Sequence, residues 1–373
     1  MADKIRIAVI FGGRSGEHEV SLMSARSVLS VLDPHKYEVT QIGITSDGRW
    51  YAGEDVLESW EKKQPAELLH VALLPEPSEN ALYALSQSTE GQILRRLIKI
   101  DVAFPVLHGT FGEDGTIQGL LELADLAYVG AGVLASSVGM DKALFKHVMR
   151  AQHLPVLEAL TLTRHQLETD KDFVVTLAEL VAPYPLFTKP VNLGSSVGIK
   201  KCHNREELIS GLHLAARYDR RILVERGLDS PREIEISVLG NDEPVASLPG
   251  EVIPSDEFYS YHAKYEDERS QLLIPAPLPE ETIENLQQIA VAAFKAVDGA
   301  GMARVDFLMD RTTGEIFLSE INTIPGFTKI SMYPKLWEAS GLAYVDLVDR
   351  LVELAIQRKA DRDRTERHYG REE

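Results

Sequence analysis

The stretch that decides the fold is residues 301–326, GMARVDFLMDRTTGEIFLSEINTIPG. It reads as two β-strands, 303–310 and 315–322, joined by a connector rich in turn residues. Side chains alternate along a strand, so Arg304 and Asp306 are predicted to share one face, as are Glu320 and Asn322. Antiparallel pairing of the strands would bring these four side chains together. Three oxygen ligands beside one guanidinium suit a hard divalent cation that carries a phosphate.

The alternative for this hairpin is an ordinary solvated polar face. The residues between the polar positions argue against it, because Val305, Phe307, Leu318 and Ile321 are all apolar. A polar set inside an otherwise apolar sheet needs a purpose, since unpaired buried charge is costly. We therefore favour metal-phosphate chemistry at this hairpin.

Composition narrows the remaining possibilities. The chain has 373 residues, 44% of them hydrophobic and 26% charged, which predicts a globular protein of two or three domains. It contains no apolar run of the roughly 18 residues that span a bilayer, and its first strand leaves no room for a cleavable leader. The chain has a single cysteine, Cys202, which excludes an internal disulfide and is typical of a protein in a reducing cytoplasm. The net charge of −18 argues against a nucleic-acid partner.

The N-terminal part has the pattern of a doubly wound α/β unit, with a strand at 4–11, a glycine-containing loop and a helix at 20–32. Glu17 in this loop is a candidate for recognising a small cationic group, and capping of the helix by Glu17 or Glu19 is equally open. The segment 53–91 is weakly patterned and is interpreted as an elaboration of this domain.

The central part offers groups suited to phosphate. Lys142 opens a predicted helix at 141–152, and Lys189 ends a strand before the Gly/Ser loop 192–198. Backbone N–H groups, hydroxyls and an ammonium at such a loop are suited to binding phosphate oxygens. The alternative is an ordinary surface hairpin loop, which can have the same sequence pattern. Glu225 and Glu233 flank a strand crossing where they could hold a nucleoside base and its ribose.

The C-terminal part has two segments without strand or core patterning. Residues 257–270, EFYSYHAKYEDERS, are polar, aromatic and aperiodic, which is typical of a lid loop. The tail 358–373 is charged throughout and is predicted to be frayed. Between these two segments, helical periodicity predicts a helix at 279–297 and further helices within 336–357. In the central part of the chain, residues 164–180 are predicted to hold one helix.

Seven segments in a fixed order make the chain resemble the ATP-grasp ligases, and within them the D-alanine–D-alanine ligase family. They are GGRSGEHEVSL (12–22), LHGTFGEDGTIQG (107–119), MDK (140–142), KPVNLGSSVG (189–198), FYSYHAKY (258–265), ARVDF (303–307) and EINTIPGFTKISMYP (320–334). Each segment alone is weak, but seven in order, from about residue 4 to about residue 351, are highly specific.

The resemblance implies an α/β protein with an ATP-grasp fold behind an N-terminal doubly wound α/β (pre-ATP-grasp) domain. It implies three parts: residues 1–130, which recognise the first D-alanine, residues 131–225, the central ATP-grasp subdomain, and residues 226–373, which carry the metal and catalytic residues. It also implies ATP as a substrate, two Mg²⁺ ions with Mn²⁺ as a substitute, and a cytoplasmic homodimer.

The resemblance also implies a role for individual residues. The implied ATP contacts are Lys142 and Lys189 at the phosphates, Glu225 and Leu228 at the adenine, Phe258 stacked on the base, Glu233 at the ribose, and Lys264. The implied metal ligands are Asp306, Glu320 and Asn322. The implied groups for the amino acids and the reacting centre are Glu17 linked to Ser195 and Tyr265, then His108, Lys264, Arg304, Gly326, Ser331 and Met332.

Two positions depart from the family pattern, which often has alanine at Ile321 and leucine at Met332. Ile321 is predicted to point away from the metal face. Met332 is expected to line the second subsite.

The implied reaction joins two D-alanine molecules through an acyl phosphate, releasing ADP and phosphate, for bacterial peptidoglycan synthesis. A D-alanine–D-lactate ligase is a rival, which Tyr265 disfavours because lactate-using relatives lack it. Another ATP-grasp carboxylate–amine ligase is disfavoured by the HEVSL and SYHAKY stretches. A nucleotide-binding regulator without catalysis is disfavoured by the complete metal and oxyanion set.

Overall fold

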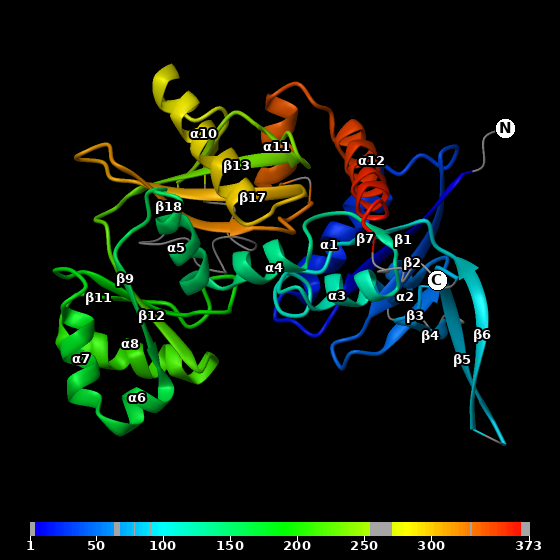
Figure 1. Ribbon diagram of the computed structural model, residues 1–373, viewed down its shortest axis with the longest axis horizontal. Helices are drawn as coiled ribbons and strands as arrows, with labels where there is room; N and C mark the ends of the chain where they lie inside the picture. Colours follow the sequence, from blue (N-terminus) through cyan, green and yellow to red (C-terminus); the bar gives the residue numbers. More distant parts are fainter. Residues whose placement is uncertain are drawn as a thin grey trace, which may run out of the picture.

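The computed structural model describes residues 4–62, 68–77, 79–89, 91–253, 271–328 and 330–366 (Figure 1). Within these ranges the strands form an eight-stranded, a four-stranded and a six-stranded sheet. Helices pack on each sheet, as expected for the predicted α/β class.

The first sheet has the order β6-β5-β4-β3-β2-β1-β7-β8. Its parallel part is β2 (Tyr37–Ile44), β1 (Ile5–Gly12), β7 (Val102–Pro105) and β8 (Ala127–Tyr128). The helices α1 (His18–Leu29), α2 (Val56–Glu61) and α3 (Thr116–Leu123) belong to the same part of the chain. The predicted opening of strand, glycine loop and helix is confirmed.

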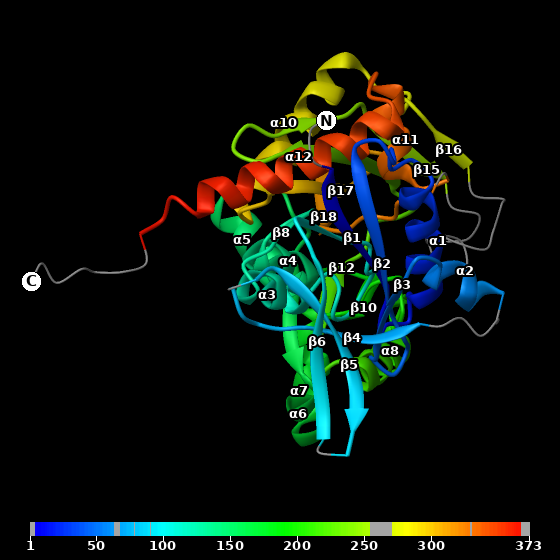
Figure 2. The same cartoon turned by 90° about the vertical axis from the view of Figure 1, so that its right-hand side faces the viewer.

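The weakly patterned segment 53–91 proves to be an antiparallel extension of this sheet. It runs from β3 (Trp50–Gly53) through β4 (Leu69–Leu73) to the hairpin of β5 (Ala81–Ser88) and β6 (Gly91–Lys99). Figures 1 and 2 show this hairpin reaching away from the rest of the molecule. Residues 91–96 of β6 are exposed, so its sequence carries no alternating apolar pattern to predict it.

The second sheet has the order β11-β10-β12-β9 and is fully antiparallel. Its strands are β9 (Ala159–Thr163), β10 (Leu186–Pro190), β11 (Lys200–Cys202) and β12 (Arg221–Arg226). Its helices are α6 (Arg164–Thr169), α7 (Lys171–Glu179) and α8 (Arg205–Tyr218). The single helix predicted at 164–180 is wrong, because Asp170 leaves the helix and caps α7 by accepting the Phe173 N–H at 3.1 Å.

The third sheet has the order β16-β15-β13-β17-β18, with β14 paired to β13. Its strands are β13 (Arg232–Gly240), β14 (Val245–Ala246), β15 (Gly250–Ile253), β16 (Gln271–Leu273), β17 (Gly301–Met309) and β18 (Ile316–Asn322). The predicted helix at 279–297 is α10 (Glu280–Ala296), which buries Leu286, Ala290 and Phe294 against this sheet. The helix α4 (Val133–Met140) lies between the first sheet and the third, and α5 (Lys142–Ala151) lies between the third sheet and the second (Figure 1).

The C-terminal helices α11 (Met332–Ala339) and α12 (Tyr344–Arg362) connect the third sheet with the first. Figure 1 shows α12, in red, beside β1 and β7. Leu347 and Leu351 of α12 share one apolar core with Val9 of β1 and Phe104 of β7. None of the helices in the described part of the chain is long and apolar enough to cross a membrane.

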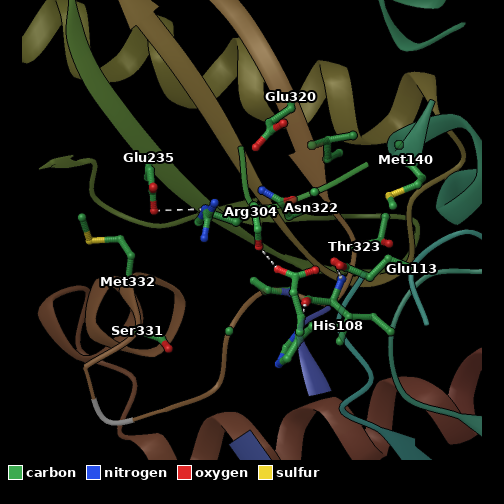
Figure 3. Close-up of a pocket in the computed structure, with 18 of the residues that line it drawn as sticks. His108, Glu113, Met140, Glu235, Arg304, Glu320, Asn322, Thr323, Ser331 and Met332 are labelled. Carbon is green, nitrogen blue, oxygen red and sulfur yellow. Dashed lines mark hydrogen bonds and ion pairs between the residues drawn. The ribbon is translucent and has the colours of Figure 1, made fainter. Parts of the chain in front are cut away.

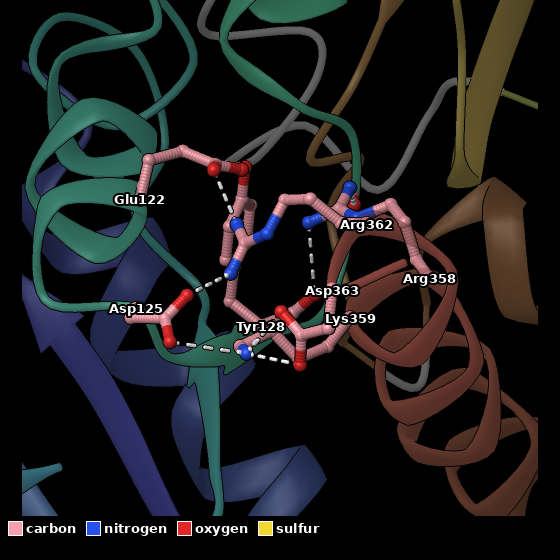
Figure 4. A network of polar contacts seen from close by, with 8 residues as sticks. Glu122, Asp125, Tyr128, Arg358, Lys359, Arg362 and Asp363 are labelled. Atoms are coloured by element: carbon pink, nitrogen blue, oxygen red, sulfur yellow. Dashed lines mark hydrogen bonds and ion pairs between the residues drawn. The ribbon is translucent and has the colours of Figure 1, made fainter. Parts of the chain in front are cut away.

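The end of α12 is held by charge (Figure 4). Arg358 lies 4.1 Å above the ring of Tyr128 and donates to the Gly130 carbonyl. Arg362 pairs with Glu122 and, at 3.1 Å, with Asp125. The prediction that the chain is frayed from residue 358 is therefore wrong for residues 358–362. These residues belong to α12, and their contacts with the first domain hold the helix in place.

Candidate active site

The hairpin of β17 and β18 has the predicted geometry. Arg304 pairs with Asn322 across the strands and Asp306 with Glu320, and the register shifts directly after Asp306. The Asn322 amide donates to Asp306 Oδ2 at 3.1 Å. The residues between them are buried on the other face, so the alternation inferred from the sequence is confirmed.

Arg304 is the centre of this polar face. Its guanidinium forms a two-pronged contact with Asp306, from Nε to Oδ1 at 2.7 Å and from Nη2 to Oδ2 at 2.6 Å. Its Nε also lies 3.0 Å from Glu235 Oε2 (Figure 3). Burial alone would lower the pKa of Arg304, but Asp306 and Glu235 outweigh it and raise that pKa above its ordinary value.

Two adjoining cavities meet at this face and share Lys142, Glu235 and Glu320. The first is lined by Glu17, His108, Ser195, Arg304, Asn322, Gly326, Ser331 and Met332. The second is lined by Lys189, Glu225, Leu228, Glu233 and Asp306. Every site residue predicted from the sequence within the described ranges therefore lies at one of the two cavities. Phe258, Lys264 and Tyr265, like the whole segment proposed as a lid, lie outside the described residues.

Glu17 links the first domain to the Gly/Ser loop. The Ser195 hydroxyl donates to Glu17 Oε1, although the two residues are 178 positions apart. Glu17 occupies the N-cap position of α1, but its side chain makes no capping hydrogen bond there. The capping alternative for Glu17 is therefore wrong, since the carboxylate points across the first cavity instead.

One buried carboxylate, that of Glu225, holds two lysines. Glu225 is 2% exposed, and it pairs with Lys146 and, at 2.5 Å, with Lys189. Burial alone would raise the pKa of Glu225, but the two ammonium groups outweigh it and hold the pKa at about 2. Lys142 donates to the Leu193 carbonyl at 2.9 Å and lies 3.3 Å from Glu320.

We expect this cluster to make folding stability sensitive to acid. A carboxyl whose pKa falls from 4.5 to about 2 on folding stabilises the protein above about pH 4.5. That contribution, about 3 kcal/mol at most, is lost as the pH falls toward 2. Urea titrations of wild type and Glu225→Gln at several pH values measure it. The variant should be less stable at neutral pH and lose less stability on acidification; parallel curves would contradict the assignment.

The sequence does not single out three further residues: Glu235 and Glu113, which line the cavities, and Lys146, which pairs with Glu225 of the second one. Glu235 follows Glu233 by two positions on β13, so strand alternation offered a signal for it. Lys146 follows Lys142 by four positions on α5, which places both on one helix face. Glu113 lies in the glycine-rich loop after β7, where desolvation and then the charge of Glu17 raise its pKa to about 8. Nothing local distinguishes Glu113 from its neighbour Asp114.

The donor set fits magnesium bound together with phosphate. Among the described residues, no three His, Cys, Asp or Glu side chains gather into a ready-made metal site. Asp306 and Glu320, with the Asn322 amide oxygen, could supply part of an oxygen shell at the wall between the two cavities. Mg²⁺ binds through one or two carboxylates and completes its shell with phosphate oxygens and water.

Comparison with known proteins identifies the family. The family model described as the D-ala D-ala ligase N-terminus matches residues 6–131, and that of the D-ala D-ala ligase C-terminus matches residues 148–353. The chain belongs to the D-alanine–D-alanine ligase family. It is 50% identical to the D-alanine–D-alanine ligase of Heliobacterium modesticaldum over 97% of each chain. It is 51% identical to that of a Thermoanaerobacter species, over 95% of this chain and 97% of the relative.

Solved structures of the family agree in fold. The D-alanine–D-alanine ligase from Coxiella burnetii is 39% identical, covers 97% of both chains and superposes with a TM-score of 0.83. The VanG D-Ala:D-Ser ligase from Enterococcus faecalis is 35% identical, with the same TM-score, over 95% of this chain and 100% of its own. The chain therefore has the ATP-grasp fold of these ligases.

Proposed function

We propose that this protein joins two D-alanine molecules into D-alanyl-D-alanine at the expense of ATP, for peptidoglycan synthesis. The observation that carries the proposal is the pair of adjoining cavities, which share Glu320 and Lys142. One cavity has the lysines and carboxylates suited to a magnesium nucleotide, and the other has the groups suited to amino acids. A phosphoryl group at the shared wall would lie within reach of both.

On the nucleotide side, Lys142 and Lys189 would neutralise phosphate charge, and Asp306, Glu320 and Asn322 would hold two Mg²⁺ ions. The ions supply further positive charge to the transferring phosphoryl group when bound. Leu228 and the strand end at Glu225 form the adenine end of the cavity, and Glu233 accepts hydrogen bonds from the ribose. The Glu225 carboxylate itself is occupied by Lys146 and Lys189, so we assign it to holding the lysines in place.

On the amino-acid side, Glu17 binds the ammonium of the first D-alanine while Ser195 holds the Glu17 carboxylate, and His108 lies beside them. The D-alanine carboxylate attacks the γ-phosphate, which gives an acyl phosphate and ADP. The amine of a second D-alanine then attacks the acyl carbon, and phosphate leaves. Arg304 and the Gly326 N–H stabilise the tetrahedral oxyanion, while Ser331 and Met332 receive the second D-alanine.

Gly326 is suited to its part by its surroundings. A Cβ at this position would meet the Ser331 hydroxyl at 2.9 Å, so a larger residue would displace the serine or the backbone. Ser331 is held in turn by Thr328, whose N–H donates to its Oγ at 3.0 Å. We therefore expect the Gly326 N–H and the Ser331 hydroxyl to keep a fixed relation to each other.

The likeness to a D-Ala:D-Ser ligase makes D-serine a second candidate for the attacking amine. We propose D-alanine, because the relatives at about half identity over nearly the full chain are D-alanine–D-alanine ligases. The test is ADP and phosphate release over a panel of D-alanine, D-serine, D-lactate and the L-amino acids, with products identified by mass. Dipeptide from D-alanine alone is expected; a preference for D-serine or D-lactate, or no coupled product, would overturn the proposal.

The remaining expectations are proposals of the same kind. We propose the division into residues 1–130, 131–225 and 226–373, replacement of Mg²⁺ by Mn²⁺, a homodimer, and a cytoplasmic location where ATP is available. A sedimentation-velocity measurement tests the dimer, and metal titrations of ATP turnover test the manganese substitution.

A further inference from the structure

One short segment of the ATP-grasp part is fixed to the N-terminal domain at both of its ends. It runs from Ile324 to Phe327, beginning two positions after the proposed metal ligand Asn322, and its two end residues are almost completely buried. Gly326 lies inside it and carries the N–H assigned above to the oxyanion. The position of that N–H therefore depends on what holds the segment.

Two side chains of the loop after β7 hold Ile324 by its backbone (Figure 3). The ring Nδ1 of His108 lies 3.0 Å from the Ile324 carbonyl oxygen, which can only accept, so this nitrogen carries the proton. Glu113 Oε1 accepts the Ile324 N–H at 3.4 Å, while its Oε2 accepts the Gly109 N–H at 2.7 Å. The backbone of Ile324 is thus held through both its N–H and its carbonyl group.

The other end is held by Ser24 of α1. Its hydroxyl is completely buried and lies 2.8 Å from His108 Nε2, and it accepts the Phe327 N–H at 3.2 Å. Because His108 Nδ1 is the donor to Ile324, Nε2 accepts the Ser24 hydroxyl proton. A continuous chain of hydrogen bonds therefore runs from Phe327 through Ser24 and His108 to Ile324.

We propose that Glu113 and Ser24 are positioning residues for the second chemical step: they set the place of the Gly326 N–H that receives the oxyanion. Neither is assigned a contact with substrate. The inference rests on the proposed ligase reaction. It makes the N-terminal domain responsible for the geometry of a donor that belongs to the C-terminal part of the chain. Phe327, the neighbour of Gly326, also packs against Phe104 of β7, with their ring centroids 6.2 Å apart.

The two substitutions that test this are Glu113→Gln and Ser24→Ala. The glutamine places an NH₂ group, which cannot accept, against one of the two backbone N–H groups. The alanine leaves the Phe327 N–H and His108 Nε2 without their partner. Both changes are close to isosteric, and each alone can decide the question.

Matched controls lie next to each residue. Asp114 also accepts two backbone N–H groups, from Phe111 at 2.8 Å and Thr116 at 3.0 Å, but both belong to neighbouring residues in the sequence. Ser21 is as buried as Ser24 on the same helix, and among the described residues its hydroxyl hydrogen-bonds with Gly12 and Val106. Asp114→Asn and Ser21→Ala thus remove comparable bonds without touching Ile324 or Phe327.

The measurement separates the two steps of the reaction. Positional isotope exchange in ATP, in the presence of D-alanine, reports formation of the acyl phosphate, and mass spectrometry reports the dipeptide. We expect dipeptide formation to fall by about tenfold or more in Glu113→Gln and Ser24→Ala, within the range of a weakened oxyanion donor. Isotope exchange should stay within about twofold of wild type, and the controls should change neither rate.

An unchanged dipeptide rate, or an equal fall in both rates, would overturn the inference, because a merely structural role affects both steps alike. Failure of the wild-type protein to form dipeptide would instead overturn the proposed function. The two results are distinguishable in the same set of assays.

Discussion

Glu320→Gln is expected to lower ATP turnover by about two orders of magnitude or more while leaving the fold intact. Glu320 lies at the wall shared by the two cavities, opposite Asp306 on the neighbouring strand and 3.3 Å from Lys142. The amide keeps the shape of the side chain but removes the negative charge that a metal ligand must offer. The apolar face of the hairpin is untouched, so the thermal unfolding transition should change little.

The measurement is phosphate release over a magnesium titration. Glu315→Gln is the matched control, because Glu315 lies in the exposed connector between β17 and β18 and contacts Thr313 rather than the cavities. The control should turn over ATP like wild type. Near-normal turnover of Glu320→Gln at ordinary magnesium concentrations would rule out Glu320 as a metal ligand.

Arg304→Ala is expected to damage both activity and stability. The Arg304 side chain is 15% exposed and forms ion pairs with both Asp306 and Glu235. Its removal leaves two enclosed carboxylates facing each other, which should lower the free energy of unfolding by about 3 kcal/mol. Loss of its charge at the reacting centre should lower dipeptide formation by about a thousandfold.

Arg304→Lys separates the two effects. A lysine keeps the positive charge but cannot make the two-pronged contact, so we expect most of the stability to return and activity to remain low. Urea denaturation and dipeptide assays measure the two quantities. Arg311→Ala is the control, since Arg311 is exposed at the tip of the same hairpin. Wild-type stability in Arg304→Ala would contradict the ion-pair account.

The polar face of the hairpin could be predicted from the sequence because strand alternation is local. The positions of Arg304, Asp306, Glu320 and Asn322 follow from a period of two and one turn, and no distant contact is needed. The break at Asp170 was missed although its signal is local too, since an aspartate before a helical stretch is a common N-cap.

Other features depend on contacts that no local pattern carries. Glu113 and His108 meet Ile324 across 211 and 216 positions, and only the folded chain brings them together. The charged end of α12 looked like a solvated tail because charge is usually exposed. Its arginines contact Tyr128, Glu122 and Asp125. These residues of the first domain come close to α12 only because the C-terminal helix returns to the first sheet.

That return of the helix to the first sheet has a consequence for how the protein is made. The two faces of β1 are covered by different parts of the chain: Ala8 and Ile10 pack with Leu121 of α3, whereas Ile7 and Val9 share a core with α12. At about 5–20 residues per second, a ribosome needs on the order of tens of seconds to reach α12 after completing β1. During that interval the nascent first domain lacks one of the helices that cover it in the folded protein. Part of the apolar surface of β1 therefore stays uncovered until α12 has been synthesised.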